Sequence, residues 1–145
     1  MNTIDPGCRA RERAEAQRDR ILDAARQCFT EHGFHAATIA NIAETAQVSA
    51  GLIYRYFENK NAIVLAIIDR QLRQSRRNIA DLQNGIDADS LVPRVADLWR
   101  KDEPNDMDPV LFLEMSAESS RNPEIAEALR HADRISADDF AVWLE

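Results

Sequence analysis

Residues 38–60, TIANIAETAQVSAGLIYRYFENK, contain two short amphipathic segments separated by a break. Thr38 is a favourable N-cap, and apolar residues follow it at helical spacing as far as Ala46. The pattern breaks at Gln47, and Ser49 is suited to cap a second short helix whose apolar residues lie within one or two turns of each other. Two short helices joined by a tight turn allow the second to lie in a major groove while the first supports it. The stretch therefore predicts a helix-turn-helix.

The same stretch resembles the DNA-binding domain of the tetracycline-repressor (TetR) family of bacterial regulators. The residues that match the family pattern in register are Thr38, Ile39, Ile42, Ala43, Ala46, Val48, Ser49, Gly51, Ile53, Tyr54, Phe57 and Lys60. Residues 21–34 also match the family's first helix and its glycine–aromatic exit. The chain departs from the pattern at Gln47, where the family usually has glycine. That turn position often needs a positive φ, which costs a residue other than glycine on the order of 1 kcal/mol.

The resemblance assigns DNA contacts to both helices of the motif, with residues 49–56 as the recognition helix. The residues expected to face base edges are Ala40, Ala50, Gly51, Leu52 and Tyr56. The residues expected to hold phosphates through hydroxyl or ammonium groups are Thr38, Thr45, Ser49, Tyr54 and Lys60. Few of the base-facing residues can form a bidentate hydrogen bond, so specificity is expected from thymine-methyl contacts, from Tyr56 and from DNA shape. Tyr56 has an equally good alternative, which is core packing against the first helix, at residues 17–32.

The N-terminal part of the chain is predicted to be a flexible arm, which can extend into helix, followed by a helix. Residues 1–16 show no apolar periodicity, and the arm either follows DNA phosphates or remains a solvated tail. Its arginines are Arg9, Arg11 and Arg13. Residues 17–32 have a periodic apolar stripe, and Gly33 is suited to end that helix. The predicted DNA-binding domain is therefore residues 17–60.

Residues 61–145 are predicted to form a helical regulatory body for ligand binding and dimerisation. A long helix is expected from the Asn59 cap to Gly85, and the resemblance implies that it transmits ligand-driven motion to the DNA-binding domain. Further caps are expected at Asp87–Ser90, Asp108–Pro109, Asn122–Pro123 and Ser136–Asp139. Family members usually carry two more long helices that form the dimer. This sequence stops at Glu145, where they would begin, so it is expected to be either naturally abbreviated or a fragment.

Aromatic and methionine side chains in this body either line a ligand pocket or form ordinary core. The candidates are Trp99, Met107, Phe112, Met115 and Trp143. Any single one of them is more easily explained as core, because most buried apolar side chains serve packing alone.

The formal net charge of −7 arises entirely from the second part of the chain. Residues 1–60 carry eight basic and eight acidic residues, whereas residues 61–145 carry ten and seventeen. A neutral DNA-binding end joined to an acidic body suits a regulator that binds DNA at one end only. No apolar run reaches transmembrane length and no signal peptide opens the sequence, so a cytoplasmic location without a membrane partner is expected.

The sequence shows no arrangement of residues typical of catalysis or metal binding. It has no Gly-rich phosphate loop and no nucleophile paired with a base. His32 and His35 lie across a helix end with no cysteine or carboxylate to complete a metal site. Cys28 lies on an apolar helix face and is better explained as a buried thiol than as a redox sensor. We therefore expect no enzyme activity, no metal and no cofactor.

Two classes of function remain. The first is a ligand-responsive transcriptional repressor that binds a palindromic operator in double-stranded DNA as a homodimer and responds to a small-molecule effector. The second is a truncated interaction module that forms a heterodimer with a related regulator and does not bind DNA specifically alone. Salt-dependent, sequence-specific binding by the purified chain separates the two.

Overall fold

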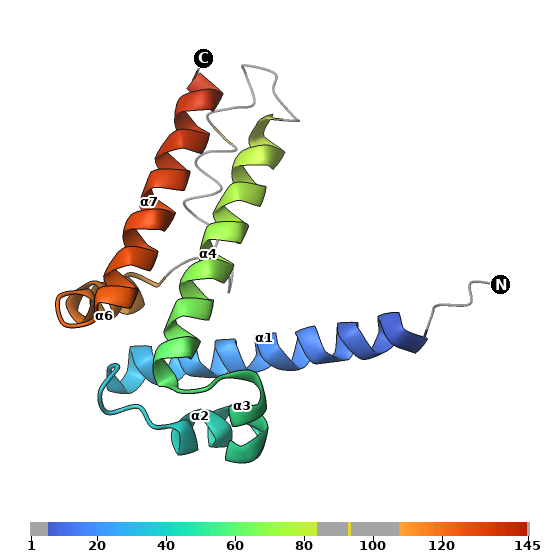
Figure 1. Ribbon diagram of the computed structural model, residues 1–145. Helices are drawn as coiled ribbons and strands as arrows, with labels where there is room; N and C mark the ends of the chain where they lie inside the picture. Colours follow the sequence, from blue (N-terminus) through green and yellow to red (C-terminus); the bar gives the residue numbers. More distant parts are fainter. Residues whose placement is uncertain (1–5, 84–92, 94–107, 145) are drawn as a thin grey trace. The chain divides into compact units, whose positions relative to one another are not determined.

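The computed structural model describes residues 6–83, 93 and 108–144, and the regular structure within these ranges is entirely α-helical (Figure 1). The predicted all-α class is confirmed. The chain divides into two compact units, Met1–Val64 and Leu65–Glu145. The boundary between them falls within the first turns of one long helix, α4 (Lys60–Gln83).

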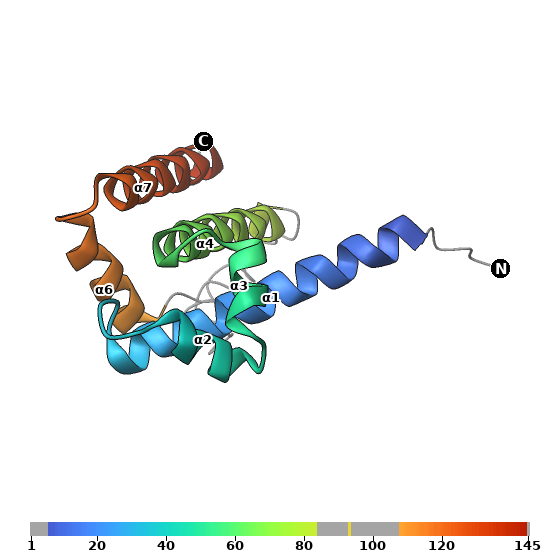
Figure 2. The same cartoon turned by 60° about the horizontal axis from the view of Figure 1, so that its bottom comes forward.

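The first unit contains the helix-turn-helix. Helix α1 (Pro6–His32) packs against α2 (Ile39–Ala46), and α3 (Ala50–Tyr56) follows α2 after a short turn. Figure 2 shows α2 and α3 against the C-terminal part of α1, whose N-terminal part extends beyond them. Both helices of the predicted motif are therefore present at the predicted positions.

Apolar side chains from these helices and from the start of α4 form the core of the first unit. The fully buried residues include Ile21, Leu22, Ala25, Phe29, Ile42, Ile53 and Ile63. Burying a side chain of this size stabilises the fold by about 1.5–3 kcal/mol, so this cluster fixes how α2 and α3 pack on α1. Gly33 ends α1 with a φ of 78°, and its N–H donates to the carbonyl of Phe29 at 2.9 Å. This is the αL helix end that the sequence predicted.

Helix α1 begins earlier than the sequence indicated. It starts at Pro6, so residues 6–16, which were predicted to be an arm that can extend into helix, are helical and exposed. Proline suits the first helical position because its missing N–H has no intrahelical partner there. Alanine, arginine, glutamate and glutamine fill most of the following positions, and these residues favour a helix without needing an apolar face.

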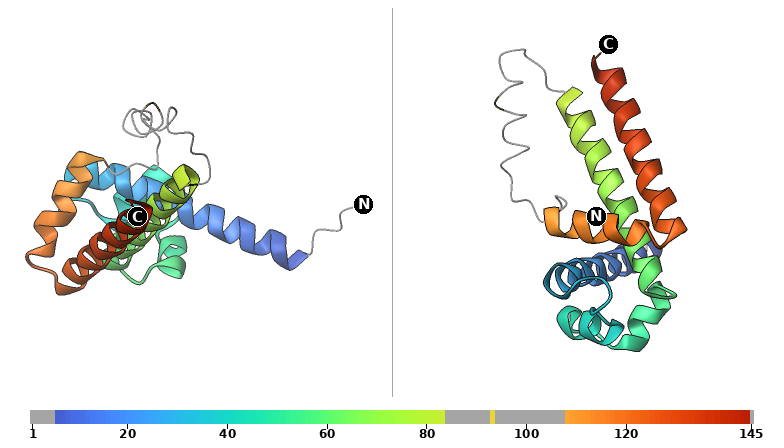
Figure 3. Two further views of the ribbon diagram at one scale, coloured as in Figure 1. Left: turned by 90° about the horizontal axis from the view of Figure 1, so that it is seen from above. Right: turned by 90° about the vertical axis from the view of Figure 1, so that its left-hand side faces the viewer.

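The second unit contains the rest of α4 together with α6 (Pro109–Ser119) and α7 (Pro123–Leu144). Figure 3 shows α6 joined to α7 by a tight turn, and the two helices pack on each other. Two of the predicted caps are confirmed, since the side chain of Asp108 accepts from the N–H of Val110 at 2.7 Å and that of Asn122 accepts from the N–H of Glu124 at 3.1 Å. Leu111 is among the residues buried in this unit.

Two other predictions for the second unit have different outcomes. Helix α7 is continuous through Ser136–Asp139, so the predicted second cap there is wrong. Asp139 instead accepts from Arg76 of α4, with Nε and Oδ2 2.9 Å apart. The helix expected to begin at Asp87–Ser90 lies outside the described residues.

Candidate nucleic-acid interface

The N-terminus of α2 is held by a reciprocal cap. The Thr38 hydroxyl accepts from the N–H of Asn41 at 3.1 Å, and the N–H of Thr38 donates to Asn41 Oδ1 at 3.0 Å. The same hydroxyl also donates to Asn41 Oδ1 at 2.7 Å. This capping box fixes where α2 begins. A phosphate at Thr38 would have to replace the Asn41 oxygen as the acceptor.

The turn between α2 and α3 has a left-handed residue, as its place in the family pattern implies. Gln47 has φ 57° and ψ 45°, which glycine adopts freely and other residues adopt at a cost of about 1–2 kcal/mol. The turn is closed by Val48, whose N–H donates to the carbonyl of Ala43 at 3.0 Å. The Gln47 side chain accepts from Arg20 Nη2 of α1 at 3.4 Å. A glutamine therefore gains a contact here that glycine lacks.

Helix α3 has one buried side and one exposed side. Its N-cap is Ser49, whose hydroxyl oxygen accepts from the N–H of Leu52 at 3.1 Å. Accepting leaves the hydroxyl proton of Ser49 available to a phosphate. Ile53 is fully buried, and Phe57 directly after the helix is also buried beneath the guanidinium of Arg18, which lies 5.2 Å from the ring centre.

The predicted base-facing residues lie on the solvent side of the motif. Ala40, Ala50 and Gly51 are exposed, whereas Leu52 and Tyr56 are half-buried. Half-burial of Tyr56 is compatible with both of its predicted roles, so that alternative stays open.

Gly51 has open space on the outer side of α3. A Cβ built at this position would have one neighbour within 4 Å, the Ser49 hydroxyl oxygen at 3.9 Å, which is an ordinary contact. Its φ is not positive. Packing and backbone conformation within the described residues therefore give no reason for glycine here. A close approach of the α3 backbone to a molecule outside the chain would be a reason for glycine at this position.

Sequence reasoning missed Arg55, the basic residue in the last turn of α3. It is exposed and follows Gly51 by four residues, so both lie on one face of the helix. The four-residue spacing from Gly51 is the sequence feature from which Arg55 could have been predicted to face the DNA. Tyr54 is 56% exposed, and its hydroxyl forms no hydrogen bond with the described residues. Arg55 and Tyr54 are thus the polar side chains of α3 best placed to meet a phosphate.

Two predicted phosphate ligands contact other parts of the first unit. The Thr45 hydroxyl lies 3.3 Å from the Cys28 sulfur, between α2 and α1, although Thr45 itself is exposed. The Lys60 ammonium donates to the carbonyls of Phe34 at 2.5 Å and Ala37 at 2.9 Å, and it lies 4.5 Å from the centre of the Phe34 ring. Lys60 therefore ties the start of α4 to the loop between α1 and α2. Its predicted phosphate contact stays a prediction.

The predicted ligand-pocket residues are not brought together by the described part of the chain. Phe112 is 49% exposed on α6, whereas Met115 is buried. Trp99, Met107 and the side chain of Trp143 lie outside what the structure describes.

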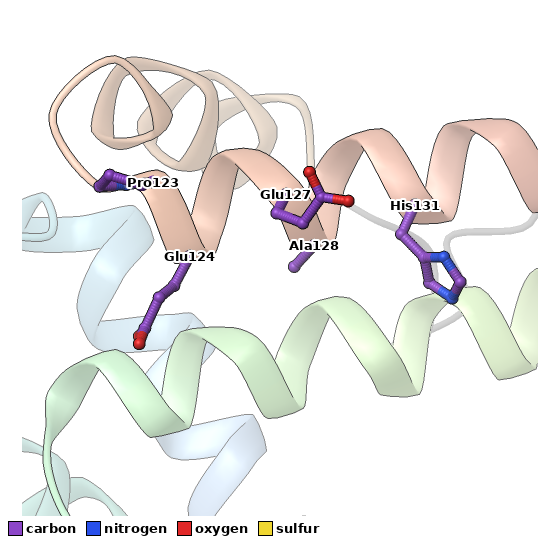
Figure 4. A pocket seen from close by; sticks show the side chains of 5 residues that line it. All are labelled: Pro123, Glu124, Glu127, Ala128 and His131. Carbon is purple, nitrogen blue, oxygen red and sulfur yellow. The ribbon is translucent and has the colours of Figure 1, made fainter.

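A shallow hollow lies instead along one face of α7. It is lined by Pro123, Glu124, Glu127, Ala128 and His131. Figure 4 shows Glu124 and His131 on the side of α7 that faces α4. Glu127 accepts from Arg130 at 3.0 Å and from Arg134 at 3.3 Å, and the Arg130 guanidinium in particular lowers the pKa of this carboxylate. The Glu127 carboxylate of this hollow is therefore already paired within its own helix.

Within residues 6–83, 93 and 108–144, no three His, Cys, Asp or Glu side chains gather so as to bind a metal ion. No helix in these ranges is both long enough and apolar enough to cross a membrane.

The helix-turn-helix lies in the part of the chain that is similar to a known protein family. Residues 21–67 match the family model described as bacterial regulatory proteins of the tetR family. The chain is 33% identical over 122 residues to the HTH-type transcriptional regulator UidR of Escherichia coli K12. That match covers 81% of this chain and 59% of UidR. The chain thus spans about three fifths of the length of this curated relative.

Solved structures agree with the sequence match. Salmonella enterica GusR superposes with a TM-score of 0.66 at 30% identity, covering 95% of this chain and 67% of GusR. A putative transcriptional regulator from Saccharomonospora viridis, solved in complex with choline, superposes with a TM-score of 0.70 at 26% identity. That match covers 89% of this chain and 68% of the other. With the motif, its turn and the exposed face of α3 in place, these similarities show that the chain belongs to the tetR family of bacterial regulatory proteins.

Proposed function

We propose that this chain is the DNA-binding part of a transcriptional regulator, together with a portion of its regulatory body. The observation that carries the proposal is the outer face of α3. Its helix is capped and anchored from inside by Ile53, while Gly51, Tyr54 and Arg55 remain exposed on the outside. A rigid short helix with an open outer face is what major-groove recognition requires.

Base recognition would come mainly from small and apolar groups. Ala40, Ala50, Gly51 and Leu52 offer contacts to thymine methyl groups and a close backbone approach, and Tyr56 adds a ring. Such residues distinguish bases weakly by hydrogen bonding. DNA shape and deformability would therefore contribute a large share of the specificity.

Phosphates would position the motif on the duplex. Tyr54 and Ser49 each have a hydroxyl proton to donate, and Arg55 brings a positive charge to the same helix. Thr38 and Thr45 are further candidates at the two ends of α2. Lys60 is the weakest candidate, because its ammonium already donates to loop carbonyls.

We further propose that the complete protein is a ligand-responsive repressor that binds a palindromic operator as a homodimer. One motif reads only a few base pairs, and two half-sites about one helical turn apart multiply affinity and specificity. The similar regulator from Saccharomonospora viridis was solved in complex with choline, which supports a small-molecule effector here without identifying it. The effector would need only different affinities for the DNA-binding and non-binding states.

The test is fluorescence anisotropy of the purified chain on duplex DNA from directly upstream of its own gene. A scrambled duplex of equal length, at two salt concentrations, is the control. Sequence-dependent binding to a palindrome supports the proposal. Equal binding to both duplexes, vanishing with salt, contradicts specific recognition by the chain alone.

A second candidate function rests on exposed apolar side chains in the second unit. These are Val110, Phe112, Leu113, Phe140 and Val142 on α6 and α7. An exposed apolar surface can mark a site that a helix of another protein covers. In the alternative, a related regulator supplies that helix, and specific DNA binding appears only in the heterodimer. Adding a full-length relative to the anisotropy assay and finding new specific binding would favour this alternative.

A further inference from the structure

The N-terminal extension of α1 has its arginines on two different sides. At about 100° per residue, Arg9, Arg13 and Arg20 fall within about 40° of one another around the helix axis, whereas Arg11 falls about 180° from their centre. We call the first three the arginine stripe. The sequence alone showed three arginines in an arm; only the continuous helix Pro6–His32 separates them into faces.

The direction of the arginine stripe is set by Arg20. Its guanidinium donates to the side chain of Gln47, the left-handed residue of the turn between α2 and α3. That turn leads directly into Ser49, the cap of α3. The stripe therefore lies on the side of α1 from which α3 begins. It continues along the part of α1 that projects past α2 and α3 in Figures 1 and 2.

Arg9 and Arg13 are available to a partner. Both are exposed, and neither forms a hydrogen bond or ion pair with the described residues. The acidic side chains of this part of α1 lie on a separate flank, centred about 90° away from the stripe. They are Glu12, Glu15, Asp19 and Asp23. The stripe therefore presents positive charge to one side even though the helix as a whole is nearly neutral.

We propose that the arginine stripe binds the phosphate backbone of DNA beside the site occupied by α3, which lengthens the contact along the duplex. The inference rests on the proposed DNA-binding function. From Arg20 to Arg9 the helix rises about 16 Å, the length of about five base pairs along one strand. The contact carries charge and position but no base readout, so it strengthens binding to all sequences alike.

The experiment compares arginines that differ only in helix face. Arg13→Gln removes a stripe arginine, Arg9→Gln/Arg13→Gln removes two, and Arg11→Gln is the matched control on the opposite side. Glutamine removes the charge while it stays polar and keeps the helix preference of the position. Each protein is titrated onto a duplex of about 30 base pairs from upstream of its gene and onto a scrambled duplex of equal length. Circular dichroism checks that helix content is unchanged.

The salt slope is the steepness with which the logarithm of the binding constant falls with the logarithm of the salt concentration. Removing one stripe arginine lowers this slope by about one, so the loss of affinity between 50 and 200 mM salt becomes about fourfold smaller. In the double variant the salt slope falls by about two, equally on both duplexes. The Arg11→Gln variant behaves as the wild type. A second readout is duplex length: trimming the DNA beyond the α3 site weakens the wild type and leaves the double variant unaffected.

Two results would contradict the proposed phosphate contact of the arginine stripe without contradicting the proposed function. One is equal behaviour of Arg11→Gln and Arg13→Gln, which would mean that overall charge rather than helix face matters. The other is specific wild-type binding with no change in either stripe variant. Failure of the wild type to bind any duplex would overturn the proposed function and the stripe together.

Discussion

Replacing Gly51 with alanine should move stability and DNA affinity in opposite directions. The added methyl group would meet only the Ser49 oxygen, at 3.9 Å, and the backbone of Gly51 is not left-handed. The fold therefore loses nothing, while alanine restricts the unfolded chain and favours the helix by about 0.5–1 kcal/mol. For a unit of this size that gain corresponds to an increase in Tm of about 2–8 °C.

On DNA the same methyl group occupies the space through which the α3 backbone would approach the duplex. A displacement of a few tenths of an ångström at a close-packed contact costs on the order of 1–3 kcal/mol, as overpacking does elsewhere. We expect the affinity for the specific duplex to fall about tenfold or more, since about 1.4 kcal/mol corresponds to a factor of ten. Two copies on one operator would multiply the loss.

Thermal unfolding by circular dichroism and anisotropy on the specific duplex measure the two effects. Gly33→Ala is the matched control, because Gly33 has a φ of 78° and the same added methyl group there should lower Tm. An unchanged affinity for Gly51→Ala would remove Gly51 from the interface. A lower Tm for Gly51→Ala would show that the space around it is not open and would refute the geometric argument.

Three other substitutions test single contacts of the first unit. Lys60→Met should destabilise the unit by about 1.5–3 kcal/mol, because it loses the charged hydrogen bonds to the carbonyls of Phe34 and Ala37. The salt slope of DNA binding should stay unchanged, and a slope lower by about one would place Lys60 on a phosphate. Gln47→Gly should raise stability by up to about 1 kcal/mol in urea unfolding, and a loss instead would mean that the Arg20 contact outweighs the backbone cost. Tyr54→Phe should weaken binding to specific and scrambled duplexes alike without changing Tm, and equal affinity on both would take its hydroxyl off the DNA.

The helix-turn-helix could be predicted from the sequence because each step of its construction has a local signature. Thr38 and Ser49 are caps whose hydroxyls accept from the N–H groups three residues later. Buried positions four residues apart, Ile42 with Ala46 and Ile53 with Phe57, give each helix its apolar side. Even the exception was visible, since Gln47 occupies a position where positive φ was expected and found.

The extension of α1 escaped prediction because it has no apolar face. Residues 6–16 bury nothing, so hydrophobic periodicity, the main signal for a helix, is absent there. Intrinsic propensity was the remaining signal. It favours a helix in a run of alanine, arginine, glutamate and glutamine, but it is weak for isolated segments of this length.

The role of Lys60 also could not be predicted from its neighbours in the sequence. Its position in the first turn of α4 opposes the helix dipole, which favoured an anionic partner. The structure supplies partial negative charge of another kind, from carbonyl oxygens more than twenty residues away. Such a long-range arrangement leaves no pattern in the local sequence. Which aromatic and methionine residues would line a ligand pocket could not be predicted for the same reason, because a pocket also depends on contacts between residues far apart in the sequence.

The two thiols of the chain differ in access in a way that gives the first unit a chemical reporter. Cys8 is exposed near the start of α1, whereas Cys28 is buried where α1 meets α2. A maleimide should therefore modify Cys8 quickly in the native chain and reach Cys28 only when the helices separate. Counting modified thiols over time thus reads out opening of the α1–α2 seam, at any temperature and with or without DNA. A dye placed selectively on Cys8 would sit one residue from Arg9.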